Sequence, residues 1–110
     1  MPTYDFFDEE TENEVTIETN DEFCWINHYN LDSKNVKRFV ILLKHATSKA
    51  KNSKCTKFKQ LVNGYEWETF LKEDKRWNVM NQVDNNVFEI SCSIDDAPIC
   101  IMRGFGFGEK

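Results

Sequence analysis

Cysteine and histidine are the residues in this chain best suited to metal binding or nucleophilic catalysis. The sequence holds Cys24, Cys55, Cys92 and Cys100, together with His28 and His45. Cys24 and His28 are four residues apart in a stretch with strand character. In a strand, that spacing places both side chains on one face, about 13 Å apart. Two zinc ligands lie much closer together than this, and no CxxC pair supplies further ligands.

A cysteine nucleophile needs a neighbouring base and a local environment that favours the thiolate. Cys24 with His28, or Cys92 with His45, could form such a pair. Neither cysteine has a flanking glycine turn or a helix N-terminus to activate it, and the sequence contains no phosphate-binding glycine loop. We therefore predict no catalytic residues, no metal site and no cofactor, and we do not expect an enzyme.

Composition indicates one folded domain in a reducing compartment. The 110 residues are 40% hydrophobic and 14% aromatic, enough for one modest core. No apolar run approaches the roughly 18 residues that span a bilayer, and the acidic N-terminus does not resemble a signal peptide. We expect a cytoplasmic protein without membrane attachment, with its cysteines reduced.

The net charge of −5 is distributed very unevenly along the chain. Residues 1–22 contain nine acidic and no basic residues, whereas residues 32–62 contain nine basic residues against Asp32 alone. Three interpretations remain open. The acidic segment could neutralise the basic one within the molecule, the basic segment could meet phosphate, or the acidic surface could meet a basic protein.

Hydrophobic periodicity predicts a helix over about residues 33–51, capped by Asp32 or Ser33. Within it, Val36, Phe39, Val40 and Leu43 follow the spacing of one helical face. Residues 14–19 alternate strictly between apolar and polar and predict a strand, followed by a second strand over 23–29. Residues 1–13 are expected to be an acidic, partly ordered arm ahead of a single domain over 14–110.

The stretch from residue 56 to residue 71 allows two interpretations. Asn63-Gly64 is typical of a two-residue hairpin turn, in which both residues need a positive φ. The resulting register would place Lys59 opposite Glu68, which is a favourable pair. Read as a helix instead, the same stretch gathers Trp67, Phe70 and Leu71 on one stripe. We favour the hairpin and keep the helix as the alternative.

The C-terminal third is predicted to be further strands. Residues 77–83 and 87–94 alternate, and a turn at 95–97 would lead into a strand from Pro98 that places Cys92 opposite Cys100. The predicted fold is therefore α+β, with one main helix packed on an antiparallel sheet of hairpins.

Residues Arg103-Gly104-Phe105-Gly106-Phe107 resemble the start of the signature of the RNA recognition motif. The resemblance implies RNA bases stacked on the two phenylalanines. The pattern then departs, since Gly108 stands in place of valine and Lys110 in place of the closing aromatic residue. We interpret the match as coincidence. Phe105 and Phe107 are then expected either to pack against the body or to form an apolar patch for a partner.

Charge and aromatic content favour a small acidic protein-binding inhibitor, antitoxin-like or of the bacterial immunity or phage anti-defence type. Its expected partner is a basic protein such as a nuclease toxin or a host defence protein, and its expected state is monomer or homodimer. The alternative is a nucleic-acid-binding module that uses the helix lysines and the Gly-Phe tail, although the acidic charge disfavours nucleic acid. The predicted partner-binding residues are Asp8, Glu9, Glu10, Glu12, Glu14, Asp21, Glu22, Trp67, Asp95, Asp96, Phe105 and Phe107.

Overall fold

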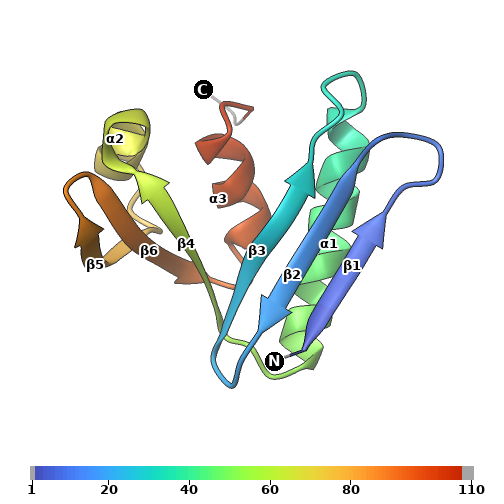
Figure 1. The fold of residues 1–110 in the computed structure, drawn as a ribbon, viewed down its shortest axis with the longest axis horizontal. Helices are drawn as coiled ribbons and strands as arrows, with labels where there is room; N and C mark the ends of the chain where they lie inside the picture. Colours follow the sequence, from blue (N-terminus) through green and yellow to red (C-terminus); the bar gives the residue numbers. More distant parts are fainter. Residues whose placement is uncertain (1, 108–110) are drawn as a thin grey trace.

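The computed structural model of the chain describes residues 2–107, and all side chains in that range except Thr69 and Phe70. Within that range the chain forms one six-stranded sheet in the order β1-β2-β3-β4-β6-β5 (Figure 1). The strands are β1 Thr3–Phe7, β2 Glu14–Thr19, β3 Phe23–Asn30, β4 Lys57–Asn63, β5 Asn78–Asp84 and β6 Val87–Ser93. The helices are α1 Val36–Asn52, α2 Gly64–Glu73 and α3 Ala97–Gly104.

The predicted α+β class is confirmed. Every neighbouring pair of strands is antiparallel except β3 and β4, which are parallel and joined through α1. The longest helix is α1, which matches the one predicted main helix, although it begins at Val36 rather than near residue 33. Two shorter helices, α2 and α3, complete the molecule.

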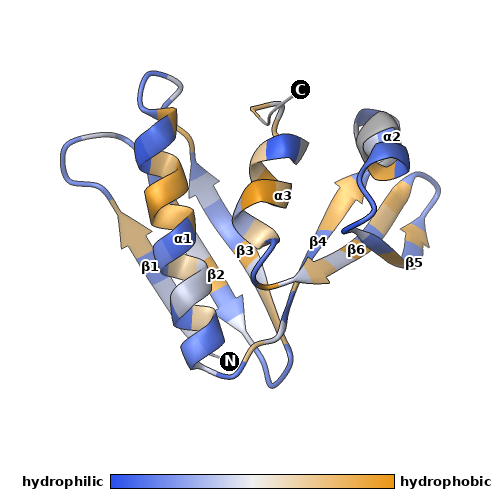
Figure 2. Cartoon of the chain, turned by 180° about the vertical axis from the view of Figure 1, so that it is seen from behind, coloured by the Kyte–Doolittle hydropathy of each residue, from blue (hydrophilic) through white to orange (hydrophobic). Residues whose placement is uncertain are grey.

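The core lies between the sheet and the helices, which cover the face seen in Figure 2. Strand β2 alternates as predicted, with Val15 and Ile17 buried and the residues between them partly exposed. The α1 stripe is also present, because Phe39 and Leu43 are buried in the core. Val36 packs only at its margin. The sheet face opposite the helices has no covering element among the described residues, and we call it the outer face.

The first residues of the chain form an edge strand. Strand β1 pairs with β2 from Thr3 opposite Glu18 to Phe7 opposite Glu14. The side chains of Tyr4 and Phe6 point inward and pack against the core. Alternation of these aromatic residues with polar ones is a strand pattern, and it accounts for regular pairing where we expected a partly ordered arm.

The predicted hairpin at Asn63-Gly64 is wrong. Residues 57–63 form strand β4, as the hairpin interpretation expected, but residues 64–73 form helix α2, as the helical alternative expected. Gly64 is absent from the described residues with positive φ, so the type I′ turn cannot form. The side-chain Oδ1 of Asn63 instead accepts hydrogen bonds from the backbone N–H of Tyr65 at 2.9 Å and Glu66 at 3.4 Å. Asn63 thus caps the start of α2. A Cβ on Gly64 would lie 2.5 Å from the Phe88 ring, so close packing requires the glycine.

The predicted C-terminal strand is also wrong, because residues 97–104 form α3. Pro98 lies in the first turn, where its missing N–H costs nothing and its fixed φ suits a helix. Cys92 and Cys100 do meet, as predicted, but across the contact between β6 and α3 rather than between two strands.

A bulge in the pairing of β2 with β3 corrects the predicted placement of Cys24 and His28. The register shifts between Thr16 and Ile17, and Asn27 is left over on β3. Cys24 therefore faces the core and is fully buried, whereas His28 lies opposite Thr16 on the outer face. A bulge reverses the alternation of side chains beyond it. No residue in this stretch of sequence indicates the bulge.

Strands β3 and β4 pair over only two positions, Phe23 opposite Lys57 and Cys24 opposite Phe58. Beyond these pairs the strands diverge, and Figure 1 shows the sheet opening into a V with β1–β3 on one arm and β4–β6 on the other. Helix α3 lies between the arms on the covered face and packs against α1, α2 and β6. No helix within residues 2–107 combines the length and apolar character needed to cross a bilayer.

Candidate functional site

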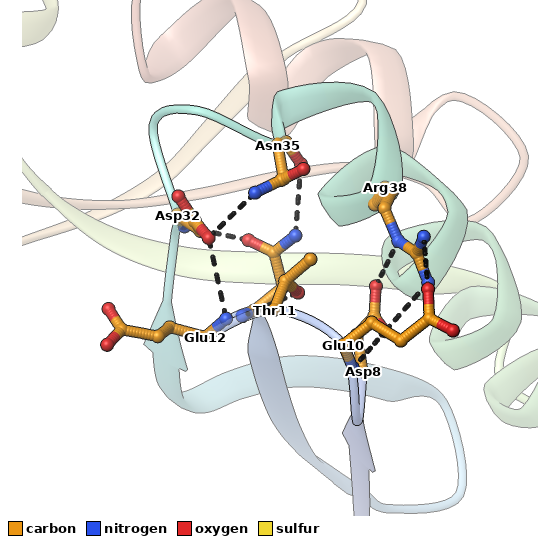
Figure 3. A network of polar contacts seen from close by, with 8 residues as sticks. Asp8, Glu10, Thr11, Glu12, Asp32, Asn35 and Arg38 are labelled. Atoms are coloured by element: carbon orange, nitrogen blue, oxygen red, sulfur yellow. Dashed lines mark hydrogen bonds and ion pairs between the residues drawn. The ribbon is translucent and has the colours of Figure 1, made fainter.

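Arg38 of α1 binds two of the predicted partner-facing carboxylates. Its guanidinium donates to Asp8 Oδ1 at 2.9 Å and to Glu10 Oε2 at 2.9 Å, and Figure 3 shows both residues of the β1–β2 loop turned toward it. The hydrogen bond from Arg38 lowers the pKa of the Asp8 carboxyl below its usual value. Arg38 carries one positive charge against the two negative ones, so it offsets about half of this charge within the molecule.

A second network fixes the same loop to the start of α1. Asn13 is buried, donates from Nδ2 to the carbonyl of Asn35 at 3.0 Å, and accepts from the backbone N–H of Asp32 at 2.7 Å. Asp32 in turn accepts from the Asn35 side chain at 2.9 Å. Hydrogen bonds to Asn35, at the helix N-cap, lower the pKa of Asp32. The loop is therefore held in one conformation against the helix (Figure 3).

The remaining predicted carboxylates divide into paired and unpaired groups. Glu22 lies 3.4 Å from Lys57, and Asp95 lies 2.8 Å from Lys51. Both pairs are exposed, so each contributes little to stability. Glu14 meets only His28, and no ion pair within residues 2–107 involves the last four, which are Glu9, Glu12, Asp21 and Asp96. The intramolecular interpretation of the charge asymmetry thus holds for part of the acidic set only.

Three carboxylates surround Thr16 on the outer face, and we call them the outer carboxylates: Asp5, Glu14 and Glu18. Asp5 accepts a hydrogen bond from the Thr16 hydroxyl at 2.9 Å. Glu14 lies 3.3 Å from the His28 imidazole, and Glu18 accepts from the Asn27 amide. Among the described contacts none of the three meets a lysine or arginine. Sequence analysis singled out Glu14 alone, although the alternation of β2 also places Glu18 on this face.

Two aromatic side chains continue the outer face on β3. Trp25 lies opposite Glu18, and Phe23 lies opposite Lys57 of β4. The Nζ of Lys59 lies 4.7 Å from the Trp25 ring centroid and 5.2 Å from that of Phe23, which is cation–π geometry. From β1 to β4 the outer face therefore passes from carboxylates through aromatic rings to lysines.

The three aromatic residues predicted to contact a partner differ in how exposed their side chains are. Trp67 is only 7% exposed and packs edge-on against Trp77 in the core, which removes it as a surface anchor. The ring of Phe105 stacks on Tyr29 at 4.8 Å between centroids, as expected for packing against the body. Phe107 is 46% exposed and remains accessible to a partner. Sequence analysis did not single out Trp25, because residues 23–26 are all apolar and the sequence does not show which of them face outward.

The cysteines lie in the interior. All four are reduced and buried, and burial raises the pKa of Cys24 to about 12. A hydrogen bond with Cys100, together with burial, raises the pKa of Cys92. Cys24 and Cys92, held protonated in this way, are poor nucleophiles and poor metal ligands. Among the described residues no three His, Cys, Asp or Glu side chains gather as a metal site.

Comparison with known proteins adds no further assignment, because the chain matches no protein-family model, no curated protein and no solved structure. The outer face is the candidate site on geometric grounds: it is uncovered, and it combines carboxylates that have no lysine or arginine partner with a half-buried indole ring.

Proposed function

We propose that this protein is a small acidic inhibitor, of the immunity or phage anti-defence type, that binds and neutralises a basic protein partner. One observation carries the proposal: the outer carboxylates lie on an uncovered sheet face without a lysine or arginine partner, and one of them, Glu18, lies directly opposite Trp25. Such a surface offers both an electrostatic target and an aromatic anchor.

The outer carboxylates supply the long-range part of recognition. Glu14 and Glu18 are four residues apart on one strand, which separates them by about 13 Å, and Asp5 lies opposite Thr16 between them. Three like charges at this spacing raise the association rate with a cationic surface and fix its orientation. Asp8 and Glu10 contribute less, because Arg38 already offsets part of their charge.

Trp25 supplies the short-range part. Binding hot spots are enriched in tryptophan, because a large rigid ring buries much area with little loss of side-chain entropy. Lys59 lies over this ring in the free protein. A cationic partner would displace the lysine and place its own guanidinium or ammonium group between the ring and the outer carboxylates.

The test uses the full chain as bait in cells that produce it. One bait carries Asp5→Asn, Glu14→Gln and Glu18→Gln; its control carries Asp8→Asn, Glu10→Gln and Asp95→Asn, which removes the same charge from paired positions. We expect a basic protein bound by the wild type and the control, with association about tenfold slower for the first variant at low salt. Equal binding by both variants would show that the outer carboxylates are not the contact.

Nucleic-acid binding is the second candidate, and the lysines on the outer face favour it. Lys57 and Lys59 flank two rings on which bases could stack, as in single-strand binding proteins. The test distinguishes the candidates by ionic strength and charge. Retention on heparin that weakens steeply with salt, and that Lys57→Gln with Lys59→Gln abolishes, would favour nucleic acid over a basic protein.

A further inference from the structure

The V-shaped opening of the sheet leaves two strand edges facing each other without a partner. The β3–β4 ladder ends at Cys24 and Phe58, whereas β3 continues to Asn30 and β4 to Asn63. No described strand lies between these two segments (Figure 1). Alternate backbone N–H and C=O groups on each edge therefore point into the opening, which makes each edge a template for another strand.

A pocket of about 410 Å³ occupies the opening. Its apolar lining comes from Ile26 and Tyr29 of β3, Leu61 of β4 and Phe105 after α3. Its charged lining comes from Lys59 and Glu89, which are of opposite sign. A cavity lined by apolar groups and a balanced charge pair suits a largely uncharged occupant.

Gln60 of β4 has a side-chain acceptor without a hydrogen-bond partner among the described residues. It lies opposite Ile90 on the helix-covered face, between Phe58 and Val62 in the strand. The acceptor is its Oε1 atom, which is buried. An acceptor left in this state is costly. Gln60 also lines the pocket, so a rotation of its amide toward the opening would let a donor of an occupant satisfy it.

We propose that this opening receives an extended segment of a partner protein, which adds a strand between β3 and β4. Only another backbone presents donors and acceptors at the two-residue repeat of these edges, about 6.6 Å. Side chains of the segment would alternate. Apolar ones would face Tyr29 and Phe105, and small polar ones would face the outer side between Lys59 and Glu89. This recognition uses backbone hydrogen bonds, so it does not depend on the outer carboxylates.

The experiment selects peptides from a phage-displayed random library on the full chain at about 1 M NaCl. The Debye length is then about 3 Å, and charge steering by the outer face is suppressed. We expect enriched sequences that alternate apolar and polar residues. In NMR spectra, a synthetic enriched peptide should shift the backbone amides of residues 25–29 and 59–61. N-methylation at alternate peptide positions should abolish binding, because it removes the ladder donors.

Matched variants locate the contact. Leu61→Trp would fill the opening, and its control is Val79→Trp on β5; both native side chains are 58% exposed. We expect Leu61→Trp to abolish peptide binding and Val79→Trp to retain it. Gln60→Leu removes the buried acceptor and should weaken binding about three- to tenfold. The proposal fails if no peptide is enriched over a scrambled control, if the shifted amides lie elsewhere, or if Leu61→Trp binds like the wild type.

Discussion

Gly104 lies directly against the indole ring of Trp67. A Cβ at position 104 would be 2.0 Å from Cη2 of that ring, far inside van der Waals contact. The glycine lets α3 approach α2 this closely, and the ring continues inward to meet Trp77 with centroids 5.8 Å apart. Gly104 was assigned to a Gly-Phe tail from the sequence, but the packing of the core requires a glycine at this position.

Replacing Gly104 with alanine should destabilise the protein by about 1–3 kcal/mol, the usual cost of overpacking a core. This cost exceeds the gain in helix propensity of about 1 kcal/mol. Urea denaturation followed by tryptophan fluorescence would measure it. In a Trp67→Phe background the smaller ring should relieve the clash, so the penalty for Gly104→Ala should shrink. An equal penalty in both backgrounds would show that the ring is not the obstacle.

Asp74 is the most buried carboxylate of the described ion pairs, with its side chain 2% exposed. Its oxygens accept from Arg76 at 2.9 and 2.7 Å and from Arg103 at 3.2 Å. The hydrogen bond from Arg76 lowers the pKa of Asp74. Because the folded-state pKa is depressed, the stabilisation is complete above the unfolded value of about 3.9 and is lost as pH falls through the folded value.

Asp74→Asn should therefore cost about 1–3 kcal/mol at neutral pH, between the values for exposed and buried pairs. The difference from wild type should narrow as pH drops below about 4. Denaturant unfolding at a series of pH values would show this convergence. Glu73→Gln, an exposed neighbour, serves as the control and should change stability little at any pH. A deficit for Asp74→Asn that stays constant with pH would contradict the ion-pair account.

The four buried cysteines should react with a thiol reagent only when the protein opens. All four are enclosed in the native state, and burial raises the pKa of Cys24 to about 12. Their reaction with a chromogenic disulfide should be slow in buffer and rapid in denaturant, with rates that follow the unfolding free energy. Rapid modification of one cysteine in the native protein, mapped by mass spectrometry, would identify an exposed thiol and refute the burial.

Asn63→Ala should destabilise the protein by about 1 kcal/mol, because it removes the side-chain acceptor that caps α2. Asn63→Asp keeps an acceptor oxygen at the same place and should be nearly neutral. Thermal unfolding monitored by circular dichroism would measure both. If aspartate cost as much as alanine, the cap would not be the source of the effect.

Sequence patterns revealed the elements whose burial follows one simple period. The alternation of β2 and the stripe of α1 each face one core, so the pattern of residues and the pattern of burial agree. The first strand, Thr3–Phe7, alternates too, but the acidic residues that follow it suggested an arm. Acidic residues beside a strand say little about whether it pairs, because its outer face is free to carry them.

The two wrong predictions of secondary structure, at residues 63–64 and 96–98, share a cause. Asn63-Gly64 and Asp96-Ala97-Pro98 each carry both a turn signal and a helix-start signal. Local sequence does not decide between them, and contacts distant in the chain do. Gly64 is fixed by Phe88, and α3 is fixed by α1 and β6. Pro98 was the local signal for α3, because proline is favoured in the first turn of a helix. The strand interpretation did not use this signal.

The candidate site was predictable only in part. The sequence shows the excess of carboxylates over residues 1–22, and the alternation of β2 shows that Glu14 and Glu18 share the face opposite the core. The ion pairs of Arg38 with Asp8 and Glu10 could not be predicted from the sequence. They join positions about thirty residues apart, and the proximity of these positions depends on how α1 packs on β1 and β2. The opening between β3 and β4 was also invisible, since no residue type marks the place where a ladder stops.

The placement of α3 has a consequence for how the protein is made. The ribosome releases β1–β3 and α1 first and β4–β6 later, and these two groups share only a short parallel ladder. Helix α3 touches α1, α2 and β6, and it emerges after all of them. A nascent chain halted before Ala97 would thus expose the apolar surfaces of two loosely connected halves. Quality-control factors would meet their target in that unfinished intermediate rather than in the completed protein.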